Sequence, residues 1–136
     1  FPMSPEEMEK ALAAFPELSD YATRLVAAYA EDPTLATLAG IHARVVIGDA
    51  RETLAAQSFE ADAWFLDGFS PAKNPELWDA DLMAQVGAHT KAGGTAATYT
   101  AAGFVRRNLE AAGFTVTRAP GFGRKRHMTH CEKPAT

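Results

Sequence analysis

The spacing of apolar residues changes several times along the chain, and each change predicts a new helix or strand. In the first stretch apolar residues recur every three or four positions, which is the spacing of one helix face. This stretch opens on Ser4, which can cap a helix, and Glu7 stands where it completes a capping box. We expect a second helix to start after Ser19 or Asp20 and to close before Pro33.

From residue 43 onward, strand patterns alternate with helix patterns, after an uncertain connector at 34–40. The expected strands are 43–47, 63–66, 95–99, 114–117 and 126–131, and the expected helices are 50–57, 74 or 75 to 87, and 101–112. This alternation predicts an α/β fold, a mostly parallel sheet wrapped by helices. The last strand is reached without a helix, so we expect it to pair antiparallel with 114–117.

The expected strand 63–66 has the features of a candidate active site. Its small, aromatic and aliphatic residues are typical of a strand buried on both faces of a parallel sheet. Asp67 follows at the carboxyl end, where open α/β sheets place their ligands, and Gly68 allows a tight turn. Spacing alone leaves a second interpretation open, in which Asp67 only caps this turn.

Composition narrows the class of protein. The chain has 136 residues, which is one domain or less, and a formal net charge of −4, which disfavours nucleic-acid binding by bulk charge. Its one cysteine, Cys131, cannot form an intrachain disulfide, so a reducing cytoplasm is the expected location. We expect no membrane association, because no apolar run approaches the roughly 18 residues of a membrane span.

Three longer motifs carry a specific resemblance. They are DAWFLDGFSPAKNP at 62–75, GGTAATYTAAGFVRR at 93–107 and GFGRKR at 121–126, supported by FP at 1–2 and GDA at 48–50. Together they resemble the methyltransferase domain of the MnmC-type tRNA 5-methylaminomethyl-2-thiouridine enzymes, over nearly the whole chain. The resemblance implies a Rossmann-like class I methyltransferase fold. It also implies that S-adenosylmethionine methylates the aminomethyl group of a modified wobble uridine in tRNA.

The same resemblance implies that part of the domain lies elsewhere. The family's first strands, and its glycine-rich loop that cradles the methionine end of the cofactor, would precede Phe1. We therefore expect a partial methyltransferase domain at 1–131 and a tail or linker at 132–136. By itself this chain is expected to bind S-adenosylmethionine weakly or not at all and to be inactive. FAD is expected only in an oxidase domain fused elsewhere.

The resemblance assigns roles to two acidic residues. Asp49 matches the acid that accepts a hydrogen bond from the adenine amino group, although an N-cap role for the helix at 50–57 explains it equally well. Asp67 is expected near the cofactor's sulfonium and as the catalytic carboxylate. A carboxylate there can orient the substrate amine and accept its proton.

Substrate contacts are expected from an aromatic residue and from basic residues. Phe69 can stack on the uracil or be an ordinary loop aromatic, and Lys73 can reach RNA phosphate or stay solvated. The densest basic cluster is Arg124, Lys125 and Arg126, which can contact phosphate or form a solvated hairpin; Arg106, Arg107 and Arg118 add to the basic residues.

No metal site is expected. His127 and His130 lie three apart, which puts them on opposite faces of a strand, and only Cys131 lies near them.

Two rival hypotheses remain open at the level of sequence. The first is a methyltransferase of the same fold that acts on a small-molecule amine. The second is a non-catalytic remnant that serves as a scaffold. A requirement for tRNA in methyl transfer separates the first rival from the tRNA enzyme.

Overall fold

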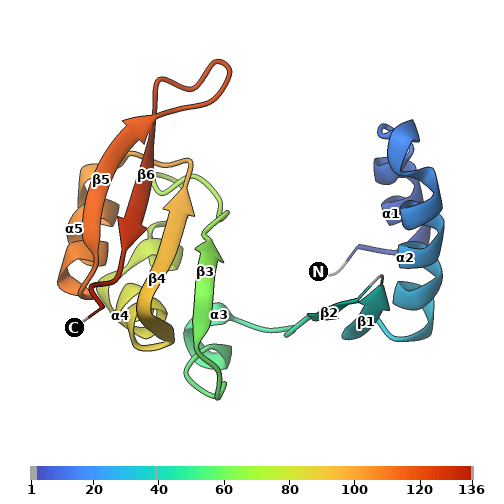
Figure 1. Cartoon of the computed structure of the whole chain (residues 1–136), viewed down its shortest axis with the longest axis horizontal. Helices are drawn as coiled ribbons and strands as arrows, with labels where there is room; N and C mark the ends of the chain where they lie inside the picture. The colour runs from blue at the N-terminus through green and yellow to red at the C-terminus, as the bar shows by residue number, and fades with distance from the viewer. Residues whose placement is uncertain (1–2, 39, 136) are drawn as a thin grey trace. The chain divides into compact units, whose positions relative to one another are not determined.

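A computed structural model describes residues 3–38 and 40–135. The chain divides into two compact units, an N-terminal unit at Phe1–Gly48 and a C-terminal unit at Asp49–Thr136. Each unit is described by itself below, with the element labels of Figure 1.

The N-terminal unit begins with two helices that local sequence signals specify. Helix α1, Pro5–Leu12, opens on the predicted capping box: the Ser4 hydroxyl accepts from the Glu7 amide, and the Glu7 carboxylate accepts from the Ser4 amide at 2.8 Å. A short 3₁₀ turn, η1, Pro16–Leu18, separates α1 from α2, Ser19–Glu31. The prediction of two helices is confirmed.

The segment after α2 differs from the prediction. Strands β1, Leu35–Leu38, and β2, Ile41–Arg44, form an antiparallel hairpin, where we expected a connector and a strand at 43–47. Gly40 allows the tight turn, because its φ of 81° lies in the left-handed region. Residues 45–47 are β-branched but lie outside any strand, and the hairpin bonding ends where the Val45 amide donates to the Thr34 carbonyl at 2.8 Å.

The C-terminal unit is built on a four-stranded sheet. Its strands are β3, Ala61–Phe65; β4, Thr90–Thr98; β5, Thr115–Pro120; and β6, His127–Glu132, in the spatial order β3-β4-β6-β5. Strands β3 and β4 are parallel, and β6 is antiparallel to both β4 and β5. The mostly parallel sheet and the antiparallel last strand are therefore confirmed, and β6 lies between β4 and β5.

Three α-helices and one 3₁₀ turn belong to this unit. They are α3, Ala50–Thr53; η2, Pro75–Trp78; α4, Ala80–Ala88; and α5, Gly103–Ala111. The single helix expected from 74 or 75 to 87 is wrong. Asp79 leaves helical geometry and caps a new helix, since its carboxylate accepts from the Leu82 amide at 2.7 Å.

Two further helices are shorter than predicted. Helix α3 stops at Thr53, because the Gln57 amide bonds the Leu54 carbonyl three residues back and so closes a tighter turn. Helix α5 begins at Gly103, and the Thr100 hydroxyl accepts from the Ala102 amide before it. Its predicted stop is confirmed, since Gly113 has a φ of 94° directly after the helix.

Helices α4 and α5 lie on one face of the sheet and enclose the core with it (Figure 1). The buried apolar side chains are Trp78, Leu82, Met83, Val86, Ala96, Val105, Leu109, Phe114 and Cys131. Burying a side chain such as Leu109 contributes roughly 1.5–3 kcal/mol relative to leaving it in water. The core therefore holds the carboxyl ends of the strands in fixed positions.

The strand β3 is not buried on both faces, which corrects the prediction. The sequence suggested a central strand, but β3 is the edge strand of the described sheet, and α4 and α5 cover one face only. Trp64 turns toward the core, whereas the side chain of Phe65 is 87% exposed. Successive strand residues point to opposite faces, so the uncovered face explains the exposure of Phe65.

The expected tail at 132–136 begins inside the sheet. Glu132 is the last residue of β6, and Lys133 exchanges two backbone hydrogen bonds with Gly93 and Gly94, of 2.9 and 2.8 Å. The Lys133 ammonium also donates to the Gly87 carbonyl at the end of α4. These contacts anchor residues 132 and 133 to the core.

Candidate functional site

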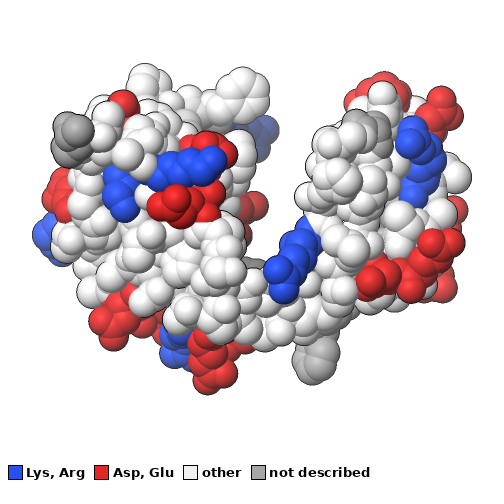
Figure 2. Space-filling model, turned by 60° about the horizontal axis from the view of Figure 1, so that its bottom comes forward, with Lys and Arg blue, Asp and Glu red and all other residues white. Residues whose placement is uncertain are grey.

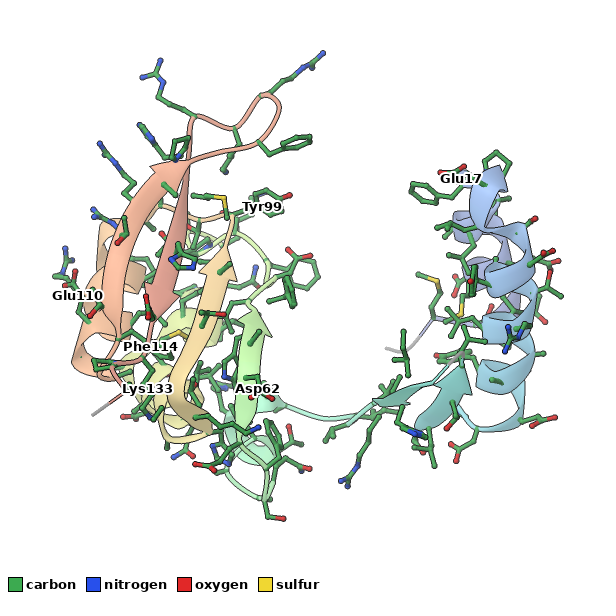
Figure 3. The ribbon with its side chains drawn as sticks, in the orientation of Figure 1. Glu17, Asp62, Tyr99, Glu110, Phe114 and Lys133 are labelled. Carbon is green, nitrogen blue, oxygen red and sulfur yellow. The ribbon has the colours of Figure 1, made fainter. Side chains whose placement is uncertain are left out.

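The carboxyl ends of β3, β4 and β5 lie at one edge of the sheet, because these three strands run in the same direction (Figure 1). Asp67 follows β3, Tyr99 follows β4, and the turn at 121–126 follows β5. Most of the residues predicted to form the site are thereby brought to one edge. Figure 3 shows Tyr99 at this edge and Asp62 near the opposite one.

The strand register places Asp67 and Tyr99 at equivalent positions, just beyond the ends of neighbouring strands. Phe65 and Ala97 are partners in the parallel ladder, and the Leu66 amide donates to the Ala97 carbonyl at 2.9 Å. Two residues beyond that pair, Asp67 and Tyr99 both line the pocket between β3 and β4, and the Asp67 amide bonds the Phe65 carbonyl at 3.0 Å in a turn that ends the strand. In the neighbouring antiparallel ladder Thr98 pairs with Thr129, so Met128 continues the same row. The row therefore runs from a carboxylate through a phenol to a thioether.

Two pockets meet at Asp67. One, of about 280 Å³, lies toward β4 and is lined by Phe65, Leu66, Asp67, Ala97, Thr98, Tyr99 and Met128. The other, of about 240 Å³, lies toward α3 and α4; Phe65, Leu66 and Asp67 line it as well, together with Ala50 and a mainly apolar set that includes Trp78. Asp67 thus lines both pockets. This arrangement can hold one reactant in each pocket, with the Asp67 carboxylate between them.

Trp78 packs against the loop after Asp67 and forms a hydrogen bond with it. The indole Nε1 of Trp78 donates to the Phe69 carbonyl at 2.9 Å, and a Cβ on Gly68 would come within 3.0 Å of the same ring. The Asn108 side chain donates to the Trp78 carbonyl at 2.8 Å. Glycine at position 68 is therefore needed for close packing, and the loop that carries Asp67 rests on the core.

Asp49 caps helix α3 in the structure. Its carboxylate accepts from the Arg51 amide at 2.9 Å and from the Arg51 guanidinium, which holds the pKa of Asp49 down at about 2. The N-cap interpretation of Asp49 is therefore correct, and contact with a cofactor stays a prediction. The next residue, Ala50, lines the pocket that Asp67 shares, so Asp49 stands at the border of that pocket.

Phe69 and Lys73 lie in the loop between β3 and η2. The Phe69 side chain is 75% exposed and lines neither of the two pockets at Asp67. The Lys73 side chain is exposed, and its amide donates to the Ser70 carbonyl at 2.9 Å. Their predicted contacts with substrate stay predictions.

Arg124, Lys125 and Arg126 lie in the turn between β5 and β6, which corrects the expectation that Arg126 begins a strand. All three side chains are exposed. The turn is tight: the Gly121 amide donates to the Arg126 carbonyl at 3.2 Å, and a Cβ on Gly121 would collide with the Lys125 carbonyl. Strand alternation therefore does not decide which of the three side chains share a face, and contact with phosphate stays a prediction.

Charges at the opposite edge of the sheet are paired. Lys91 and Asp62 form an ion pair of 2.8 Å there, and Figure 2, which brings this side forward, shows basic and acidic side chains next to one another. The basic turn at 124–126 follows β5 and so lies at the other edge, where β3 and β4 also end (Figure 1).

Three other features bear on the predicted chemistry. Burial raises the pKa of the Cys131 thiol to about 11, so this thiol is protonated and a poor nucleophile at neutral pH. Across residues 3–38 and 40–135 no three His, Cys, Asp or Glu side chains gather as they would around a metal ion. Of the helices in these same residues, none combines the length and apolar character needed to cross a membrane.

The sequence missed Tyr99 as a candidate site residue. Its position at the end of the strand next to the one that carries Asp67 was the available signal, because carboxyl ends of parallel strands meet at one edge. The register between the two strands, which puts Tyr99 and Asp67 at equivalent positions, becomes visible only in the structure.

Comparison with known proteins identifies relatives. Residues 16–134 match a family described as S-adenosyl-L-methionine-dependent methyltransferase. The chain is 48% identical over 133 residues to the tRNA 5-methylaminomethyl-2-thiouridine biosynthesis bifunctional protein MnmC of Ectopseudomonas mendocina, covering 94% of this chain and 20% of that protein. The protein of the same name from Hahella chejuensis is 41% identical over 138 residues, with 94% and 21% covered. This chain thus spans about a fifth of these relatives.

A solved structure gives the same result for the fold. The crystal structure of MNMC2 from Aquifex aeolicus superposes with a TM-score of 0.64 and 33% sequence identity, over 74% of this chain and 35% of that one. Together with the sheet order, this confirms the predicted Rossmann-like methyltransferase fold.

Proposed function

The chain belongs to the S-adenosyl-L-methionine-dependent methyltransferase family, and from this premise we propose that it forms part of an enzyme that methylates the aminomethyl group of a modified wobble uridine in tRNA. The observation that carries the proposal is the pair of pockets that meet at Asp67. The names of the relatives, which concern 5-methylaminomethyl-2-thiouridine in tRNA, supply the substrate class.

The pocket toward α3 suits the cofactor. It is lined mainly by apolar side chains, as an adenosine requires, and it has Asp67 at one end and Ala50, next to Asp49, at another. We place S-adenosylmethionine there, with Asp49 toward the adenine and Asp67 toward the sulfonium. When bound, S-adenosylmethionine supplies a methyl group on a positively charged sulfur, and the sulfur keeps the electron pair of the carbon–sulfur bond that breaks.

Asp67 acts on the other reactant, the amine. An alkylamine is mostly protonated at neutral pH, and its nitrogen needs a free lone pair to form the new bond. The Asp67 carboxylate accepts the proton that the nitrogen loses and holds the nitrogen in line, which combines general-base help with orientation. Asp67 borders both pockets, and the cofactor is assigned to the one toward α3. The amine therefore has to enter the other pocket, from the β4 side.

The basic turn at 124–126 supplies the RNA contact in this proposal. The chain has a net charge of −4, so binding to RNA has to depend on a local cluster, since charges act together only within a Debye length of about 8 Å. The turn lies at the same edge of the sheet as Asp67 (Figure 1). We therefore assign phosphate contacts to Arg124, Lys125 and Arg126, with Lys73 as a further contact.

The remaining assignments follow from the substrate. A tRNA-modifying enzyme acts in the cytoplasm, and no metal takes part in the proposed transfer. The relatives are named bifunctional, and an FAD-dependent oxidase activity would belong to a fused domain outside these 136 residues.

A methyl-transfer assay tests the proposal in the complete methyltransferase domain that carries these residues. The domain is incubated with S-adenosylmethionine and tRNA bearing 5-aminomethyl-2-thiouridine, and the digested nucleosides are analysed by mass spectrometry. We expect one added methyl group on the wobble nucleoside. The free nucleoside serves as the control: efficient methylation without tRNA supports the small-molecule rival, and no methylation of either substrate supports the scaffold rival.

The RNA surface has its own test. Replacing Arg124 and Arg126 with Gln is expected to weaken tRNA binding and to reduce the log–log salt slope by about 0.9 per lost phosphate contact. Arg24→Gln and Arg44→Gln, in the N-terminal unit, form the matched control, and the affinity for S-adenosylmethionine should stay constant. An unchanged slope would move the RNA contact to Arg106 and Arg107 or to another domain.

A further inference from the structure

We propose that Tyr99 is the residue on which the substrate base stacks, so that the pocket between β3, β4 and β6 is the base pocket. The inference rests on the proposed function and deepens it. Of the two interpretations of Phe69, base stacking or an ordinary loop aromatic, it favours the second.

The position of Tyr99 follows from the strand register. Phe65 pairs with Ala97 across the parallel ladder, so Asp67 and Tyr99 lie at equivalent positions, two residues beyond that pair. Both line the pocket of about 280 Å³. A base stacked on Tyr99 would therefore present its ring substituent to Asp67, which is the carboxylate assigned to the amine.

The lining of this pocket suits a single flat base. Phe65, Leu66, Ala97 and Met128 give it an apolar floor, and the carboxylate of Asp67 and the phenol of Tyr99 are its polar groups. Unpaired bases in RNA are commonly bound by stacking on aromatic side chains.

Location favours Tyr99 over Phe65 and Phe69, the other two aromatic residues close to Asp67 in the chain. Tyr99 is 56% exposed, so the residue is partly covered by the protein and leaves surface free for a base. Phe69 lines neither pocket at Asp67. Phe65 lines both pockets, but it lies two residues before Asp67, further from the edge where RNA arrives.

The row of Asp67, Tyr99 and Met128 continues across the sheet to the strand that precedes the basic turn. Met128 pairs with Ala119 on β5, directly before the segment that ends in Arg124, Lys125 and Arg126. A nucleotide whose base lies on Tyr99 would thus have its backbone directed toward the proposed phosphate contacts. Base pocket and basic turn are successive parts of one edge.

Photocrosslinking tests the contact directly. An anticodon stem-loop with 5-iodouridine at the wobble position is bound to the complete domain and irradiated, since iodouracil crosslinks to aromatic rings stacked on it. After trypsin digestion, mass spectrometry should place the crosslink on Tyr99, within the peptide at 92–106. A crosslink on Phe65 or Phe69, or no crosslink, would overturn the proposal.

Kinetics provide the second readout. Tyr99→Leu should lower kcat/KM for tRNA by about 5-fold to 150-fold, the value of one base–aromatic stack, with unchanged affinity for S-adenosylmethionine. Tyr99→Phe keeps the ring and should stay within about 3-fold of wild type. Tyr21→Leu is the matched control, because Tyr21 is 53% exposed but lies in the N-terminal unit.

The outcomes separate this inference from the proposed function. If wild-type protein methylates tRNA and Tyr99→Leu is equally active, Tyr99 does not stack on the base and the proposed function stands. If Tyr99→Phe is as impaired as Tyr99→Leu, the phenol rather than the ring is required and stacking is wrong. If wild-type protein methylates no tRNA, the proposed function itself fails.

Discussion

The two units of the chain differ in what specifies them. The N-terminal unit has clear local signals, with a complete capping box at Ser4 and two amphipathic helices, yet none of its described residues is buried. In the C-terminal unit α5 lacks a side-chain cap, yet this unit encloses a core in which Val105, Leu109 and Cys131 are fully buried.

The comparison separates secondary structure from stability. Capping and helix propensity each contribute about 1 kcal/mol. This is enough to favour a helix over other local structures, but it does not offset the conformational entropy gained on unfolding. Burial in a shared core contributes more and acts cooperatively. The candidate site lies in the unit that has the core, where the strand ends are fixed by packing.

The largest expected difference between the units comes from truncating a leucine in each. Leu109→Ala in α5 should lower the free energy of unfolding by about 2–5 kcal/mol, because it leaves a cavity in the core. Leu25→Ala in α2, a partly exposed position, should cost about 1 kcal/mol or less. Urea denaturation followed by tryptophan fluorescence measures the first, and amide hydrogen exchange in α2 measures the second. Equal losses in both units would contradict the comparison.

A smaller effect is expected from a buried hydrogen-bond chain in the C-terminal unit. The Trp64 indole donates to the Thr90 hydroxyl at 2.9 Å, which donates to the Val86 carbonyl at 2.6 Å. Thr90→Val keeps the shape but leaves both partners unpaired, so it should cost about 1–3 kcal/mol in denaturation. Thr117→Val at an exposed strand position is the control, and a neutral Thr90→Val would show that water satisfies the indole.

The sequence predicted what local signals determine and missed what depends on tertiary contacts. It located α1, α2 and the mostly parallel sheet, because capping residues and periodicity are read from neighbours in the chain. It missed the break at Asp79, since the apolar residues on both sides fit one continuous helix pattern. It also placed Phe65 in a buried strand, although exposure depends on which faces of the sheet are covered.

The candidate site divides in the same way. Asp67 could be found from the sequence, because an acid after an apolar strand and before glycine marks a strand end. Tyr99 had a weaker signal, its position at a strand end, because its alignment with Asp67 depends on the register of two strands. The role of Asp49 stayed open, and the structure shows the N-cap that both interpretations allowed.

In the N-terminal unit, Ser4→Ala should act locally. Removing the cap should destabilise α1 by about 0.5–2 kcal/mol, because the Glu7 amide loses its partner. Faster amide exchange in the first turn of α1, without change in the C-terminal unit, is the expected result. Ser19→Ala is the control, since α2 has no side-chain cap. Equal exchange in both variants would mean that the capping box does not stabilise α1.

The smallest effect concerns pH and the cap of α3. Arg51 holds the pKa of Asp49 at about 2, below its ordinary value of 3.8. A lowered folded-state pKa gives stability that is present above the ordinary value and lost as pH falls from about 4 to about 2. Carboxyl NMR should follow this titration, and Arg51→Gln, which keeps the backbone donor, should raise the pKa of Asp49 toward 3.8. An unchanged pKa would exclude the guanidinium as the cause.

The central claim is that Asp67 is the carboxylate between cofactor and amine, and one kinetic comparison tests it most directly. Asp67→Asn and Asp62→Asn change the same group at opposite ends of one strand, and Asp62 has only an exposed ion pair with Lys91. In single-turnover methyl transfer to tRNA by the complete domain, Asp67→Asn should be slower by about 10²-fold or more, with S-adenosylmethionine affinity little changed. Asp62→Asn should match wild type. An Asp67→Asn enzyme that transfers methyl at the wild-type rate would contradict the claim and leave Asp67 as a turn cap.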